Sequence, residues 1–168
     1  MSVVLRYDAK FHLDETPALA VDLVPSNPTL QHRVSYAGVS GTLDGTTTVA
    51  ITEGNSDRIA LTAGAYTLDL RAFTGFGGVA KDLNGLKVKG IIIVAAPGNT
   101  AGVKVVKGAS NPYQIWGTTA GEVTVYPGFP VEVIFGNNLA AVSATVKTID
   151  FSSADTDAEF EVILVVGA

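Results

Sequence analysis

The sequence predicts an all-β chain: an antiparallel β-sandwich or jelly roll with about ten to twelve short strands and no long helix. Three observations lead to this prediction. Apolar and polar residues alternate with the period of two that strands require, helical periodicity is nearly absent, and turn residues recur about every 8–12 residues. The run from residue 87 to residue 168 carries the pattern most clearly.

In the first half of the chain, the pattern predicts strands at residues 18–24, 46–53, 58–62 and 65–72. Pro25 ends the first strand, because a proline cannot donate to a strand ladder. The second strand, TTTVAITE, is rich in β-branched residues and stops at Gly54-Asn55. Ala63-Gly64 is expected to form the turn of a hairpin. The last segment, AYTLDLRA, alternates strictly, which indicates one buried and one wet face.

In the second half, the glycine-rich segment 74–85 interrupts the pattern and predicts a long loop between two sheets, or an arm. Strands are then predicted at 87–95, 103–107, 112–116, 122–126, 131–135, 143–151 and 158–166. Each is short, rich in Val, Ile or aromatic residues, and bounded by Gly, Pro or Asn.

At 168 residues the chain is long enough for one domain with a substantial core, so residues 1–168 are predicted to form a single sandwich domain. Residues 1–17 and 25–45 are less regular. They are expected to form an N-terminal arm and a connector that fold onto neighbouring subunits, or ordinary edge strands of the same sandwich.

Composition limits the classes of partner. Hydrophobic residues make up 47% of the chain and charged residues 16%, and the mean hydropathy is +0.34. A domain with so few charged residues has trouble covering itself with polar surface, and this favours burial of part of that surface against other subunits. The longest apolar run, 91–96, is far shorter than the roughly 18–20 residues of a membrane span. A net charge of −5 with scattered basic residues argues against nucleic acid. Charges at Arg6, Asp8 and Lys10 argue against a secretion signal.

No catalytic or cofactor-binding constellation is evident. There is no cysteine, and neither His12 nor His32 lies at a spacing typical of metal ligands. No Gly-x-Ser-x-Gly elbow occurs, and the glycines at 75–78 lack the lysine and the helix of a phosphate loop. We therefore expect a protein that is not an enzyme and holds no cofactor.

Two weaker candidates concern binding. Asp155 and Asp157 are spaced so that both could reach one calcium ion, but the segment lacks the glycine and the terminal glutamate of an EF-hand loop, and a solvated turn before the last strand is the preferred interpretation. Aromatic residues in the strands of a sandwich belong more often to the core, and Tyr113 and Trp116 are the candidates for contact residues if any of the aromatic residues are exposed.

Residues 87–168 also resemble known proteins in the order of their features. A strand at 87–95 is followed by a Gly-Asn-Thr loop at 98–100, a Lys-Gly-Ala-x-Asn-Pro turn at 107–112, a Tyr-Pro-Gly turn at 126–128, and a final strand that ends on Gly167. In this order the segment resembles small virion structural proteins of tailed phages, in particular jelly-roll capsid cement (decoration) proteins.

The resemblance implies a non-enzymatic protein of the virion that binds across shell subunits and stabilises the capsid. It implies a homotrimer, the major capsid protein as partner, assembly in the host cytoplasm, and no contact with nucleic acid or membrane. A tail-associated module that binds a receptor or carbohydrate is the alternative, and exposed Tyr113 and Trp116 would support it. A cupin-type enzyme would need a His/Glu metal set, which the positions of His12 and His32 do not supply.

Overall fold

The computed structural model describes residues 5–15, 32–43, 51, 53–75, 79–117, 121–135 and 137–168. These residues contain twelve β-strands and no helix, and therefore no helix that could cross a membrane. The chain divides into two compact units, one of which is Leu5–Thr42. The prediction of an all-β, antiparallel sandwich is confirmed in the larger unit.

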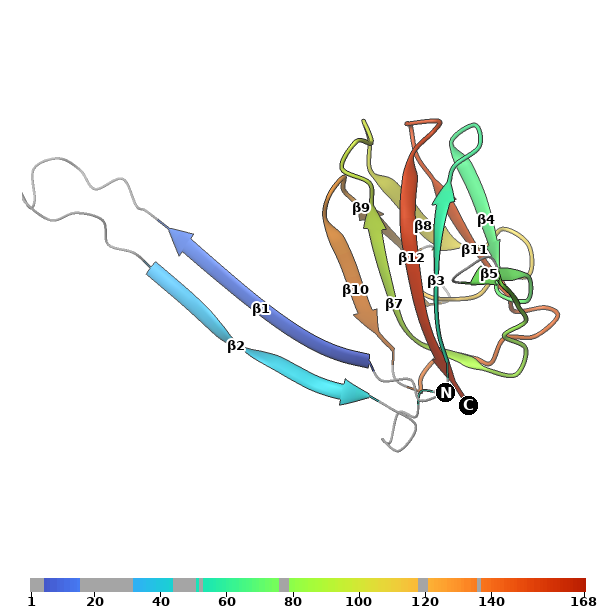
Figure 1. Ribbon diagram of the computed structural model, residues 1–168, viewed down its shortest axis with the longest axis horizontal. Coiled ribbons are helices and arrows are strands. Elements are labelled where there is room, and N and C mark those ends of the chain that lie inside the picture. Colours follow the sequence, from blue (N-terminus) through green and yellow to red (C-terminus); the bar gives the residue numbers. More distant parts are fainter. Residues whose placement is uncertain are drawn as a thin grey trace, which may run out of the picture. The chain divides into compact units, whose positions relative to one another are not determined.

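The smaller unit is a two-stranded sheet of β1 (Leu5–Glu15) and β2 (His32–Leu43), which run in opposite directions (Figure 1). β1 lies within the predicted arm and β2 largely within the predicted connector. The two strands pair with each other in a sheet of their own, so they are not edge strands of the sandwich. Contact of this unit with neighbouring subunits stays a prediction.

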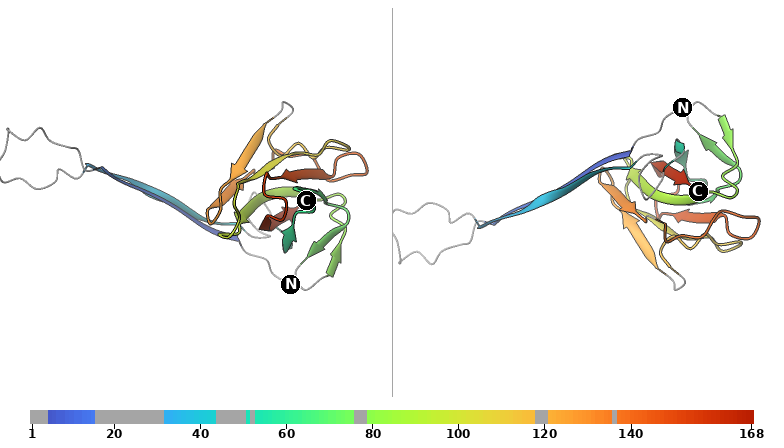
Figure 2. Two further views of the ribbon diagram at one scale, coloured as in Figure 1. Left: turned by 90° about the horizontal axis from the view of Figure 1, so that it is seen from above. Right: turned by 90° about the horizontal axis from the view of Figure 1, so that it is seen from below.

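The larger unit contains two four-stranded sheets. Sheet I has the order β10 (Pro130–Ile134), β7 (Lys87–Ala95), β12 (Glu159–Gly167), β3 (Glu53–Ala60). Sheet II has the order β4 (Ala65–Asp69), β11 (Thr148–Ser152), β8 (Val103–Lys107), β9 (Glu122–Val125). All pairs within both sheets are antiparallel. Figure 1 looks onto the outer face of sheet I, and Figure 2 shows the two layers from above and below.

The pairing of these eight strands is nested. The first pairs with the last (β3 with β12), the second with the seventh (β4 with β11), the third with the sixth (β7 with β10), and the fourth with the fifth (β8 with β9). The chain therefore folds like one long hairpin that is wound around the core. A small hairpin of β5 (Phe73–Gly75) and β6 (Val79–Lys81) is inserted between β4 and β7.

The core lies between the two sheets. From Ile91 to Ala95 on β7 and from Phe160 to Leu164 on β12, every second residue is buried. These residues belong to one apolar cluster with residues of sheet II such as Val105. Phe160 of sheet I stacks on Phe151 of sheet II, with ring centroids 4.4 Å apart and an interplanar angle of 21°. This contact joins the two layers across the core.

Several predicted elements need correction. β3 runs through Gly54-Asn55, where the sequence predicted a strand end, because β12 is long enough to pair with it from residue 53 to residue 60. The segment 74–85, predicted as a loop, contributes to the β5–β6 hairpin. The predicted strand 143–151 begins only at Thr148, since Ser143 N donates to Val146 O at 3.0 Å and closes a turn.

The predicted strand 112–116 is also wrong. Pro112 makes only an isolated bridge to Thr148, and the chain then turns. The cause is local: Asn111 has a φ of +53°, and a proline has no amide to donate to a ladder. Predicted strand 18–24 and most of 46–53 lie outside the described residues.

Candidate interaction surface

The outer face of sheet II is polar. Thr67 of β4 donates its hydroxyl to Asp150 Oδ1 at 2.7 Å, and the amide of Ala109 donates to Asp150 Oδ2 at 2.8 Å. Farther across the same face, the Lys104 ammonium lies 3.3 Å from Glu122. These side chains are exposed or half-buried, and they give this face the composition of a surface in contact with water.

The outer face of sheet I is different, because its outward positions are mostly apolar. The strand registers arrange them in three rows across β10, β7, β12 and β3. In that order, the rows are Pro130, Val94, Glu161 and Arg58; then Glu132, Ile92, Ile163 and Ser56; then Ile134, Gly90, Val165 and Gly54. The middle of the face is thus formed by isoleucine and valine, and most of these side chains are half-buried. Charged residues lie only toward the edges and at one end.

A tight turn at residues 126–129 joins β9 to β10 and carries two exposed aromatic side chains. The amide of Phe129 donates to Tyr126 O at 3.0 Å, and Gly128 has a φ of +78°. With Pro127 in the second position, these are the features of a type II turn, which needs glycine in the third position. A further bond, from Gly128 N to Ala95 O at 2.9 Å, fixes the turn to the end of β7.

The fixed turn leaves Tyr126 64% exposed and Phe129 69% exposed. They are the only large hydrophobic side chains among the described residues that are exposed to this degree. Aromatic side chains held outward on a fixed backbone are typical of contact surfaces, because little conformational entropy is lost when they are covered.

A pocket of about 220 Å³ opens beside this turn on the outer face of sheet I. Its lining residues come from the ends of β3, β7 and β12: Arg58, Val94, Ala95, Ala96, Pro97, Phe160 and Glu161. Pro97 also lies next to Gly128, so the pocket and the aromatic turn are neighbours. The Arg58 guanidinium, 73% exposed, is paired with Glu159 at the rim.

Tyr113 and Trp116, the candidate contact residues of the sequence analysis, are not at this surface. Tyr113 is 1% exposed, so it is a core residue and not an exposed contact residue. Its hydroxyl accepts from Val88 N at 3.0 Å and donates to Ala140 O at 2.8 Å. Burial raises the pKa of this hydroxyl, and the bond from the Val88 amide opposes the rise. Tyr113 is therefore part of the core, and its hydroxyl connects the backbone at Val88 with that at Ala140.

Trp116 is half-buried. Its indole N–H donates to Val105 O at 3.0 Å, and its ring lies 5.9 Å from that of Phe135. A second pocket, of about 430 Å³, lies near this region and is lined by Tyr113, Gln114, Leu139, Val146 and neighbouring residues. Since both aromatic residues are engaged within the chain, they offer less contact area than Tyr126 and Phe129.

The carboxylate of Asp155 has a structural role. Its Oδ2 accepts from Thr100 N at 2.7 Å and its Oδ1 from Asp157 N at 3.3 Å. The bond from Thr100 is the main cause that lowers the pKa of Asp155. Within the described residues, no group of three or more His, Cys, Asp or Glu side chains could hold a metal ion. The side chains of His12 and His32 lie outside the description.

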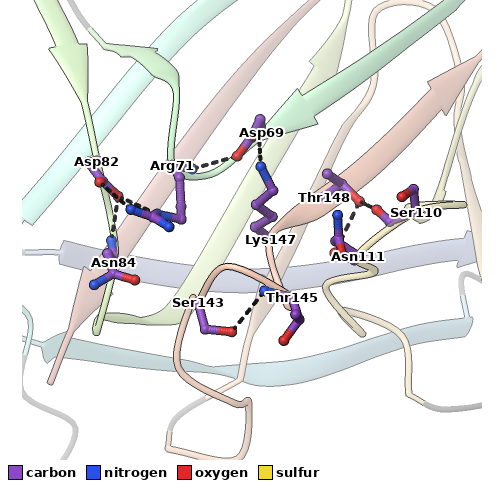
Figure 3. A network of polar contacts seen from close by, with 10 residues as sticks. All are labelled: Asp69, Arg71, Asp82, Asn84, Ser110, Asn111, Ser143, Thr145, Lys147 and Thr148. Carbon is purple, nitrogen blue, oxygen red and sulfur yellow. Dashed lines mark hydrogen bonds and ion pairs between the residues drawn. The ribbon is translucent and has the colours of Figure 1, made fainter.

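At the other end of the sandwich, a network of polar contacts ties the loops together (Figure 3). The Arg71 guanidinium makes two hydrogen bonds to Asp82, at 3.1 and 3.2 Å, and Lys147 pairs with Asp69. Partial burial raises the pKa of Asp69, but the bonds from Lys147 and the Arg71 amide, together with both positive charges, outweigh it and hold the pKa below its usual range. This end is thus fixed by ion pairs, whereas the turn end carries exposed aromatic residues.

A lysine is also fully buried near the start of β7. Lys89 is 0% exposed, and its ammonium donates to Asn137 Oδ1 at 2.5 Å and to Ala168 O at 2.6 Å. Burial, followed by the charge of Lys87, lowers its pKa. The contacts connect β7 with the chain after β12 and explain why a cation is tolerated there.

No protein-family model matches the chain, and no curated protein matches it either. Among solved structures, the chain is similar to a chain in the cryo-EM structure of the virus-like particle of the giant freshwater prawn Macrobrachium rosenbergii extra small virus (XSV). The similarity covers 86% of this chain and 93% of that chain, with 12% identity and a TM-score of 0.34. A likeness this distant assigns no function to this chain.

Proposed function

We propose that the protein is a non-enzymatic structural protein of a virus particle, in which neighbouring subunits cover part of the sandwich. The observation that carries the proposal is the contrast between the two outer faces. Sheet II presents Thr, Ser, Asp, Lys and Glu to water, while sheet I presents Ile92, Val94 and Ile163 together with the aromatic turn. An apolar face rimmed by charges is typical of a surface made for assembly.

The strand order supports this class of protein. Two four-stranded sheets with nested pairing are the arrangement of a jelly roll, and we infer that the larger unit is one. Jelly rolls occur in viral capsid proteins, lectins and cupins. Among these, the apolar outer face of sheet I and the exposed aromatic turn favour assembly or sugar binding.

In its finer form, the proposal is a capsid cement (decoration) protein that binds the major capsid protein across shell subunits. The resemblance of residues 87–168 to such proteins of tailed phages supports this form, and the high apolar content agrees with it. The homotrimer is likewise an expectation from the resemblance.

Electron microscopy of purified protein, alone and mixed with shells of the virus that encodes it, tests the proposal. Saturable binding to shells, without particles formed by the protein alone, is the result expected of a decoration protein. Particles formed by the protein alone would keep the virion role but replace decoration with shell formation. Neither particles nor binding would overturn the proposed function.

One observation favours a second candidate, a carbohydrate- or receptor-binding module. Tyr126 and Phe129 lie beside a pocket with a guanidinium and a carboxylate, from Arg58 and Glu161, which is a combination that can stack on and hydrogen-bond to a sugar. A glycan array with the natural protein and Tyr126→Ala tests it. Binding that is lost in the variant would support this candidate, and no binding to any glycan would exclude it.

A further inference from the structure

We propose that the outer face of sheet I packs against the same face of a second copy of this chain, about a twofold axis parallel to the strands. The proposal deepens the proposed function, because it names one partner of the assembly surface. It predicts a dimeric contact and so differs from the homotrimer that the resemblance implies. Three features of the face support a second copy as the occupant.

The first feature is the strand order. In sheet I the order is β10, β7, β12, β3, and a twofold axis between the two central strands places β7 of one copy over β12 of the other, and β10 over β3. Ile92 and Ile163 are direct neighbours in the middle row of one chain. The rotation therefore brings four isoleucines together at the axis, two from each copy. Packed sheets lie about 10 Å apart, a distance that such side chains fill.

The second feature is the match of bulky and small residues. In the third row, Ile134 on β10 is at the same level as Gly54 on β3. The rotation places Ile134 of each copy over Gly54 of the other, where no side chain obstructs it. Close packing of this kind distinguishes a specific interface from a casual apolar contact.

The third feature is charge. Glu132 on β10 and Arg58 on β3 are at opposite edges of sheet I, three strand spacings or roughly 14 Å apart, too far to pair within one chain. The rotation brings Glu132 of one copy over Ser56 of the other, and Arg58 lies two residues farther along β3, in the next row. The exposed Arg58 guanidinium can then meet Glu132 of the second copy at the rim.

The aromatic turn fits the same arrangement. It lies at the β10 side of the sheet, and the pocket lies over β7, β12 and β3 at the same end. The rotation carries the turn toward the pocket of the other copy. A cavity of roughly 150 Å³ holds a benzene ring, so a pocket of about 220 Å³ admits the ring of Phe129. Arg58 at the rim can stack on that ring.

Engineered cysteines test the geometry, because the chain has none of its own. Glu132→Cys and Ser56→Cys are prepared as separate full-length variants, mixed, and treated with a short bis-maleimide cross-linker, because facing Cα atoms about 10 Å apart are too distant for a disulfide. The proposal predicts cross-linked dimers in the mixture and far fewer in either variant alone. Thr67→Cys mixed with Lys104→Cys, both on the polar face of sheet II, is the matched control and is expected to remain monomeric. No excess of dimer over this control would overturn the proposal.

A second measurement covers the strength of the contact. Ile163→Glu is expected to weaken self-association by at least about tenfold in sedimentation equilibrium, the equivalent of about 1.4 kcal/mol. Thr67→Glu, on the face of sheet II, is expected to leave it unchanged. Circular dichroism of both variants checks that they fold. If Ile163→Glu proves unfolded, Glu132→Arg, which reverses the rim charge, replaces it and is expected to weaken association as well.

The native mass of the unaltered protein separates this inference from the proposed function. A dimer agrees with the twofold contact. A trimer without the mixed cross-link would overturn the contact and favour the arrangement that the resemblance implies. A monomer would overturn self-association through this face, and shell binding in the microscopy experiment would then still decide the proposed function.

Discussion

Tyr113→Phe is expected to destabilise the protein although it removes a single oxygen atom. Tyr113 is 1% exposed, and its hydroxyl bonds both the amide of Val88 and the carbonyl of Ala140. Val88 is 0% exposed, so its N–H loses this partner in a place where water does not replace it. Ala140 is exposed, so its carbonyl can bond to water instead.

The expected magnitude follows from that difference. One buried donor without a partner costs about 1–3 kcal/mol, and the carbonyl adds little. In a chain of this size 1 kcal/mol corresponds to roughly 2–4 °C, so the melting temperature should fall by about 2–12 °C. The phenyl ring remains, so no cavity of the size of a side chain contributes to the loss.

Urea denaturation followed by fluorescence or circular dichroism measures the free energy of unfolding, with an unchanged m-value as the check on two-state behaviour. Tyr126→Phe is the matched control. It removes the same atom from a ring that is 64% exposed, and its effect should stay within about 0.5 kcal/mol. Equal stabilities of the two variants would refute the assignment of Tyr113 to the core.

Two further changes test other contacts. Gly108→Ala should lower the free energy of unfolding by about 1–3 kcal/mol or more, because a Cβ there would lie 1.9 Å from Thr148 Oγ1. Gly98→Ala is the control, since its Cβ would have no atom within 4 Å, and it should be close to neutral in the same urea titration. Asp155→Asn should lower stability at pH 6, and its difference from the natural protein should shrink on acidification. The bond from Thr100 lowers the pKa of Asp155, so the stabilisation by this carboxylate is present above the usual pKa of 3.8 and is lost as the pH falls through the pKa of the folded protein. A stability difference between variant and natural protein that stays constant down to about pH 2.5 would contradict this reasoning.

The parts of the fold that the sequence predicted are those set by local patterns. Alternation on β4, and the apolar runs on β7 and β12, mark strands whatever they pair with. The turn at Ala63-Gly64 was also predicted, and Ala63 has a φ of +53° and Gly64 of +77°. Local patterns do not predict which strands pair with each other, because nested pairing joins strands such as β3 and β12 that are about a hundred positions apart in the sequence.

The candidate surface was predicted less well, and the choice between aromatic residues shows why. Tyr113 and Tyr126 both flank prolines and glycines, so local composition does not separate them. Tyr113 is buried because Val88 and Ala140, both distant in the sequence, close over it. A usable signal existed at Tyr126-Pro127-Gly128-Phe129, since proline and glycine at the centre of a type II turn place the flanking residues at the surface.

The run IIIV at residues 91–94 carries a second signal that becomes clear only with the sheet in view. An antiparallel strand with one wet face should alternate, as β4 does, while a strand covered on both faces is apolar throughout. Ile91 and Ile93 point into the core, and Ile92 and Val94 point outward from sheet I. An outward threonine at either position would satisfy a strand that meets water, and it would retain the β-branched shape. Isoleucine and valine stand at these two outward positions instead, and this agrees with the proposed contact, in which the same face of a second copy covers them.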